Sequence, residues 1–147
     1  MNRCLRLGAV LFFACACASA RDSTAVCDLT VIVTGLKSDR GDVQIGLFNS
    51  AESFRGKSPK FMGAALPIAD RRAEWRVGTI PFGEYAVKLF HDEDGDDTVD
   101  RNFIGMPTES IGFSNRAKIG LAGAPGFNKS KFLLNSPERT VVIELNQ

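Results

Sequence analysis

From Val26 onward, hydrophobic residues alternate with polar ones, which is the period-2 pattern of strands with one buried face. Clusters of Gly, Pro, Asp and Asn interrupt this pattern about every ten residues, as turns do. No segment has a convincing helical period, and there is no internal repeat. The pattern predicts an all-β fold, an antiparallel β-sandwich of about seven strands. The clearest runs are 29–33, 43–47, 73–77, 85–89, 132–134 and 141–145.

Three segments between these runs need separate interpretation. The segment 51–66 predicts a helical turn or an irregular crossover, and its Ser58-Pro59 pair opposes a long helix. Pro81-Phe82-Gly83 predicts a tight turn, with Tyr85 placed to bond back to nearby backbone as a corner tyrosine. The segment 100–131 is too long for a passive connection. We expect three phenylalanines to pin it to the sandwich: Phe103, Phe113 and Phe127.

The first twenty residues have the features of a secretory signal peptide. Arg3 and Arg6 precede the apolar run Leu7–Ala16, and Ala18-Ser19-Ala20 fits the small-residue cleavage rule. The run is too short for a membrane anchor, which needs roughly 20 apolar residues, and no later segment qualifies as a transmembrane span. Lipid attachment at Cys15 or Cys17 is the other alternative, but the leucine expected three residues earlier is absent. We expect a signal peptide over 1–20, a single domain over 21–147, and a periplasmic or secreted protein.

Charge and cysteine content narrow the classes of function. The whole chain has a net charge of +1, which provides no basic excess for binding nucleic acid. Without the two arginines of the leader, 16 basic and 17 acidic groups remain. Cys27 is then the single cysteine, so no disulfide can form within the domain. It is either a free thiol near the first strand or a bridge between two chains.

The segment from His91 to Asp100 contains six carboxylates and no basic residue, and mutual repulsion among them favours a bound cation. Asp92, Asp94, Asp96 and Asp100 occupy positions 1, 3, 5 and 9 of an Asp-x-Asp-x-Asp calcium loop. Ligands that are all oxygen favour Ca²⁺ over zinc or copper. The sequence therefore predicts a weak calcium-binding acidic loop over 92–100.

The match to a calcium loop is incomplete. The glycine expected at position 6 lies at position 4 as Gly95, Asp97 takes the turn position, and position 12 is Phe103 instead of Glu. No paired helices flank the loop, so an EF-hand is not expected. The alternative is a solvated acidic hairpin loop rich in turn-forming Asp and Gly.

Several motifs together resemble a family of secreted bacterial proteins, domain of unknown function 2141. They are Ile80–Val87, Phe90–Glu93, Asn102–Pro107 and Gly112–Asn115, and the resemblance extends from about Leu29 to the C-terminus. It implies a small exported β-sandwich related to the transthyretin-like and carboxypeptidase regulatory-like modules, with no established activity. We expect the sandwich to be immunoglobulin-like or transthyretin-like. The family's usual loop has Asn and Gly where this chain has acidic residues, so the present loop is more acidic.

The residues offer little for catalysis. His91 is the only histidine, so a Ser-His-Asp hydrolase would have to combine it with Ser110 or Ser114 and with Asp92. An open acidic loop also lacks the dry cleft that paired-carboxylate chemistry needs. We therefore expect a non-enzymatic exported module with an unidentified protein or cell-envelope partner. The alternative is a small metal-assisted hydrolase that uses His91 and the acidic loop.

The leader yields a direct test. If Ala20 ends the signal peptide, N-terminal sequencing of the exported protein should begin at Arg21. Finding Met1, or a lipid on Cys17, at the mature N-terminus would contradict the prediction.

Overall fold

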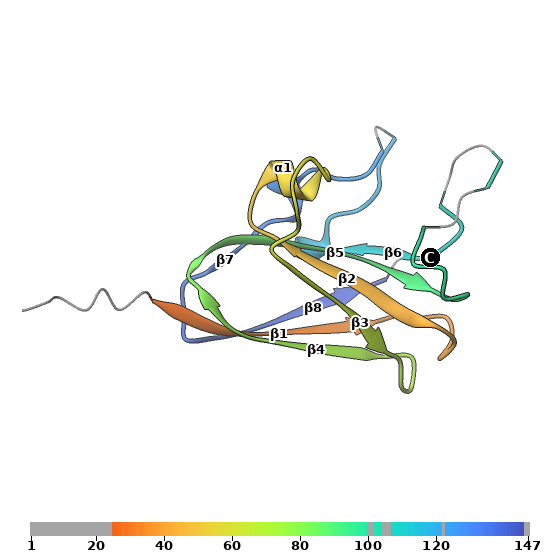
Figure 1. The fold of residues 1–147 in the computed structure, drawn as a ribbon, viewed down its shortest axis with the longest axis horizontal. Helices are drawn as coiled ribbons and strands as arrows, with labels where there is room; N and C mark the ends of the chain where they lie inside the picture. Colours follow the sequence, from red (N-terminus) through yellow and green to blue (C-terminus); the bar gives the residue numbers. More distant parts are fainter. Residues whose placement is uncertain (1–24, 100–101, 104–106, 122, 146–147) are drawn as a thin grey trace, which may run out of the picture.

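The computed structural model describes residues 25–99, 102–103, 107–121 and 123–145. Two β-sheets stack face to face to form a sandwich (Figure 1). The three-stranded sheet has the order β4-β1-β8, with β1 at Val26–Thr34, β4 at Ala73–Pro81 and β8 at Glu138–Glu144. The five-stranded sheet has the order β3-β2-β5-β6, and β7 also pairs with β5. Its strands are β2 Asp42–Phe48, β3 Met62–Pro67, β5 Gly83–Asp92, β6 Ile111–Phe113 and β7 Phe132–Leu134.

The core consists of the residues that the alternation places on the inner faces. In β1, Leu29, Val31 and Val33 are buried, whereas the residues between them are more exposed. Across the sandwich, β5 buries Val87 and Leu89 against them in one hydrophobic cluster. The expected all-β sandwich is therefore confirmed, because period-2 patterning fixes which face of each strand leaves water.

The structure adds two details to the predicted fold. The described residues form eight strands, in line with the expected number of about seven, and β1 pairs with β8 in parallel, from Asp28 opposite Glu138 to Thr34 opposite Glu144. The segment 51–66 contains the expected helical turn, α1 (Ala51–Phe54), but it also enters β3. The pattern hides β3 because this edge strand is rich in Gly and Ala and largely exposed, so hydrophobic alternation does not mark it.

The corner tyrosine is confirmed, since the Tyr85 hydroxyl donates to the Pro81 carbonyl at 3.0 Å. Two of the three phenylalanines that we expect to pack on the sandwich also do so. Phe113 and Phe127 are buried in a second cluster with Phe54, at ring-centroid distances of 6.4 and 6.1 Å from it. This cluster fastens α1 and the short helix α2 (Phe127–Ser130) to the five-stranded sheet. Phe103 is 99% exposed, so the expectation that it packs on the sandwich is wrong.

The predicted signal peptide over 1–20 and the mature start at Arg21 lie outside the described residues. Cys27 is a free thiol with no exposed surface, and burial raises its pKa, so a bridge between chains would require β1 to open. Among the described residues, no helix has the length and apolar character that crossing a membrane requires.

The outer face of the five-stranded sheet carries the extra structure. In Figure 1, α1 and the segment 117–121 lie on this side, whereas β1, β4 and β8 are the described elements that form the opposite side of the sandwich. Outward-facing residues of β2 and β5 therefore lie beneath loops instead of facing open solvent.

The turn into β2 packs directly on the end of β5. Gly41 has φ of +68°, and a Cβ at this position would overlap the carbonyl oxygen of Asp92. Gly56 has a similar φ of +75°, but a Cβ there would meet nothing within 4 Å. Gly41 is therefore required both for its backbone conformation and for close approach.

These two glycines form a matched pair for a stability measurement. Gly56→Ala should lower the free energy of unfolding by about 1–2 kcal/mol, the cost of left-handed backbone for an L-residue. Gly41→Ala should lower it by about 3 kcal/mol or more, because the overlap adds a further 1–3 kcal/mol. Urea unfolding monitored by circular dichroism measures both, and equal losses would show that Gly41 is not packed against Asp92.

Candidate functional site

The acidic loop begins with a buried carboxylate. Asp92 is the last residue of β5 and has no exposed surface. Its Oδ1 accepts hydrogen bonds from the backbone N–H groups of Gly95 at 2.8 Å and Asp96 at 3.3 Å. Its Oδ2 accepts from the N–H of Asp97 at 2.9 Å. One side chain therefore folds the following five residues into a turn around itself.

The protonation state of Asp92 reflects two opposing effects. Burial disfavours the charged form of Asp92 and acts to raise its pKa. The three backbone hydrogen bonds and a hydrogen bond with the Asp94 side chain favour the charged form and act to lower the pKa. The hydrogen bonds outweigh burial, so the pKa of Asp92 lies below its ordinary value. Asp92 is consequently a carboxylate at neutral pH, as a metal ligand must be.

Three of the four predicted metal ligands come together. Asp92, Asp94 and Asp96 each offer a carboxylate oxygen, and these three oxygens lie within 4.8 Å of one another. Asp94 and Asp96 are exposed, and Asp96 also accepts from the N–H and hydroxyl of Thr98 at 2.8 Å each. The fourth predicted ligand, Asp100, lies outside the described residues.

The backbone of the loop explains one mismatch with the calcium-loop pattern. Position 6, where glycine is expected, is Asp97, and it adopts a left-handed φ of +61° all the same. Asp is among the residues that tolerate this region best. The Asp97 carboxylate also accepts a hydrogen bond from Gln44 Nε2 at 2.6 Å, so β2 holds the strained residue in place.

Sequence reasoning missed Asp42, which lies opposite Asp92 in the pairing of β2 with β5. Its Oδ1 is buried and has no hydrogen-bond partner. Burial raises the pKa of Asp42, and the nearby charges of Asp92 and Asp97 raise it further. Because Asp42 is fifty residues away in the chain, only strand pairing brings it to the loop.

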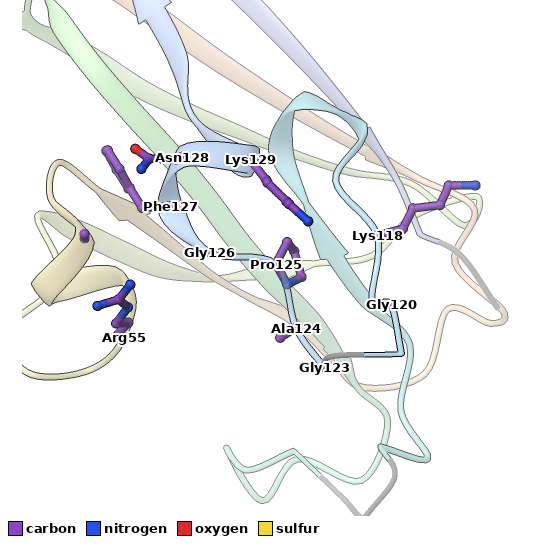
Figure 2. Close-up of a pocket in the computed structure, with 11 residues that line it drawn as sticks. Arg55, Lys118, Gly120, Gly123, Ala124, Pro125, Gly126, Phe127, Asn128 and Lys129 are labelled. Atoms are coloured by element: carbon purple, nitrogen blue, oxygen red, sulfur yellow. The ribbon is translucent and has the colours of Figure 1, made fainter.

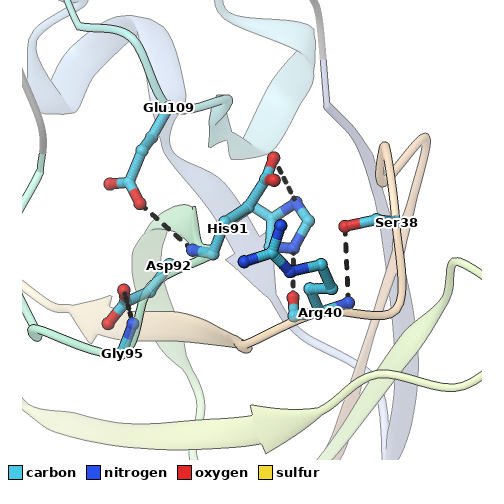
Figure 3. A network of polar contacts seen from close by, with 7 residues as sticks. Ser38, Arg40, His91, Asp92, Gly95 and Glu109 are labelled. Atoms are coloured by element: carbon cyan, nitrogen blue, oxygen red, sulfur yellow. Dashed lines mark hydrogen bonds and ion pairs between the residues drawn. The ribbon is translucent and has the colours of Figure 1, made fainter.

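His91 points to the other side of β5, into the sandwich, and is fully buried. Its Nε2 lies 2.8 Å from the carbonyl oxygen of Arg40, so this nitrogen carries the proton (Figure 3). Its Nδ1 has no hydrogen bond and lies 3.8 Å from a carboxylate oxygen of Glu93. The Glu109 carboxylate accepts from the Glu93 N–H at 3.2 Å and ties the far end of the loop to its start.

The candidate Ser-His-Asp combination is not assembled. Ser114 is buried and its hydroxyl donates to the Ser130 carbonyl at 2.6 Å, while the N–H of Val87 donates to the hydroxyl at 2.8 Å. The Ser110 hydroxyl is buried without a hydrogen bond, so it does not bond to His91. Within the described part of the chain, neither serine is activated by the histidine.

A separate hollow of about 310 Å³ lies beside α2 and the glycine-rich turn before it (Figure 2). Arg55, Lys118 and Lys129 line it, and none of its described lining residues is acidic. All three are exposed, and the Lys118 side chain extends away from the other residues in Figure 2. These cations remain solvated on the rim of the hollow and do not converge on one point.

Asp42 and Asp92 should respond in opposite ways to loss of charge. In chelator at pH 7, Asp92→Asn should lower the free energy of unfolding by about 1–3 kcal/mol, since hydrogen bonds to its charged form are lost. Asp42→Asn should leave it unchanged or raise it, since a disfavoured charge is removed. Urea unfolding of both variants tests this, and equal destabilisation would contradict the opposite roles.

The pH dependence follows from the two pKa shifts. The lowered pKa of Asp92 means that its stabilisation is complete above the ordinary value near 4 and is lost as the pH falls through the lowered value. The raised pKa of Asp42 means that its charge begins to destabilise the fold as the pH rises above the ordinary value, and this destabilisation is complete above the raised value. Both variants should therefore approach the wild type as the pH is lowered, the Asp42 variant first.

Comparison with known proteins gives one match. A family model described as an uncharacterized protein conserved in bacteria (DUF2141) matches residues 31–142. No curated protein and no solved structure matches the chain. The matched range contains the acidic loop and most strands of both sheets. The chain therefore belongs to the DUF2141 family of uncharacterized bacterial proteins.

Proposed function

We propose that this protein is an exported, non-catalytic β-sandwich module whose acidic loop binds Ca²⁺ through Asp92, Asp94, Asp96 and Asp100. The observation that carries the proposal is the convergence of three carboxylates within 4.8 Å. Calcium–oxygen distances are about 2.3–2.6 Å, so two oxygens on one ion are at most about 5 Å apart. The spacing of the three oxygens is compatible with one shared ion.

The hydrogen bonds within the loop support this proposal. Backbone hydrogen bonds fix the Asp92 carboxylate and Thr98 fixes that of Asp96, so little ordering is needed when the ion binds. Asp92 Oδ2 and Asp96 Oδ2 each accept one of the described hydrogen bonds, which leaves each a second lone pair for the metal. The buried and unpartnered Oδ1 of Asp42 adds negative charge at the same end of the sheet.

Calcium suits the loop better than magnesium. Calcium accepts six to eight oxygens in irregular geometry, whereas magnesium requires a tight octahedron and gives up water reluctantly. Position 12 of the pattern lacks the bidentate Glu, so we expect an affinity of the extracellular type, with Kd of about 10⁻⁴ to 10⁻³ M. Such an affinity suits a periplasmic or secreted protein and would leave the site empty at cytosolic calcium levels.

The proposed role is structural or in binding a partner. Calcium would neutralise the repulsion in the loop and order the segment that follows it, at one end of the sandwich. The signal peptide predicted from the sequence over 1–20 supports export, and an unidentified protein or cell-envelope component is the proposed partner. The hydrolase alternative receives no support from the buried His91, because the hydroxyls of Ser110 and Ser114 do not hydrogen-bond to its ring.

Calcium should raise the melting temperature. A ten-fold excess of calcium over Kd stabilises the folded state by about 1.4 kcal/mol. At this chain length, about 1 kcal/mol moves Tm by roughly 3–6 °C. Scanning calorimetry in millimolar CaCl₂ should therefore show a rise of several degrees, with a smaller rise in MgCl₂. An unchanged Tm at 10 mM calcium, about ten-fold above the weak end of that range, would refute the calcium site.

Two double variants separate specific binding from a general charge effect. Asp94→Asn with Asp96→Asn keeps oxygen ligands but removes two charges, so it should weaken calcium binding and raise stability in chelator. Glu52→Gln with Asp70→Asn removes two exposed charges elsewhere and is the matched control. The control should keep the full calcium-induced rise in Tm, and an equal loss in both variants would contradict specific coordination.

A further inference from the structure

A groove of about 440 Å³ lies on the outer face of the five-stranded sheet, on the side that carries α1 in Figure 1. Strand pairing builds its floor in two rows: Gly46 and Phe113 flank Lys88, and Gln44 and Ile111 flank Phe90. Loop residues, including Val99 and Ala124, form its rim. The volume is within the range of small-molecule sites.

Paired glycines make the groove and place a cation beside it. Gly46 lies opposite Gly63 in the pairing of β2 with β3. A Cβ on Gly46 would approach the Phe48 ring to 2.8 Å, and a Cβ on Gly63 would approach Lys60 Nζ to 2.7 Å. Because both side chains are absent, the Lys60 chain lies flat across the sheet and lines the groove.

The second cation, Lys88, rises from the floor and is half-buried. Its Nζ donates to the Phe54 carbonyl at 3.0 Å and lies 5.1 and 5.2 Å from the ring centroids of Phe48 and Phe54. An ammonium group has three N–H donors, and this carbonyl takes one of them. Among the described residues, neither Lys60 nor Lys88 forms an ion pair.

Asp97 is the acidic side chain among the described residues that line the groove, and it forms no ion pair with Lys60 or Lys88. Asp97 lies at the rim, where Gln44 Nε2 donates to its carboxylate at 2.6 Å. The groove thus presents a partly desolvated ammonium next to aromatic and aliphatic surface. That combination matches a ligand with an anionic head and an apolar body.

We propose that this groove binds a small organic acid, with its carboxylate on Lys88 Nζ and its aromatic or aliphatic body on Phe90 and Ile111. Lys60 contributes a second positive charge at the edge. Charge-assisted hydrogen bonds from an ammonium to a carboxylate are stronger where water is partly excluded. The site is distinct from the proposed calcium ligands and does not require a bound ion.

Chemical-shift titration of the ¹⁵N-labelled protein in EDTA tests the proposal, with 3-phenylpropionate as the probe. Saturable shifts should be confined to amides around Gly46, Phe90 and Ile111. The uncharged 3-phenylpropionamide and the cation 3-phenylpropylammonium should bind at least ten-fold more weakly. Equal binding of the three compounds, shifts spread over the surface, or no saturation by 10 mM would overturn the proposal. This comparison of ligands requires no variant.

Lysine substitutions then test which ammonium group binds the carboxylate of the ligand. Lys88→Met keeps the aliphatic chain and should weaken binding of 3-phenylpropionate at least ten-fold. Lys60→Met changes an exposed side chain and should weaken binding about three-fold, whereas the matched control Lys129→Met should not change it. If Lys88→Met does not fold, the affinity of Lys60→Met for 3-phenylpropionate still tests the proposal. Unchanged binding in whichever of these two variants folds would overturn it. EDTA keeps the outcome independent of the calcium proposal.

Discussion

The Asp92 carboxylate, with three backbone N–H groups donating to it, is the interaction on which the acidic end of the molecule depends. It terminates β5, turns the chain, and brings Asp94 and Asp96 to the same point. Such a buried charge is stable only because every hydrogen bond is made, since an unpaired carboxylate at this depth would be costly. The close approach of Gly41 to the Asp92 backbone joins this turn to the start of β2.

The two faces of β5 lie in different environments. Inward residues such as Val87 and Leu89 hold the sandwich together, and His91 ends this row by donating to the Arg40 carbonyl. Outward residues such as Lys88 and Asp92 are also removed from bulk water, because loops and α1 cover that face. Burial lowers the pKa of Lys88, whereas hydrogen bonds lower that of Asp92 against the effect of burial. One strand thus supplies both a cationic groove and an acidic loop.

Much of the fold and part of the site can be predicted from local pattern. Alternation identifies the buried faces of β1, β2, β4 and β5, and the spacing of Asp92, Asp94 and Asp96 identifies three carboxylates that do converge. These predictions succeed because strand period and loop length act over a few residues. The edge strand β3 escapes the same reasoning, because its Gly and Ala residues carry little hydrophobic signal.

By itself, the sequence determined the all-β class, the corner at Tyr85 and the acidic loop, since each depends on neighbours in the chain. Tertiary structure alone decided the parallel pairing of β1 with β8, the position of Asp42 opposite Asp92, and the groove around Lys88. The burial of Phe127 and the exposure of Phe103 were decided in the same way. The physical reason is that these features join residues about twenty to more than a hundred positions apart, and local periodicity does not specify which strands pair or which face a loop covers.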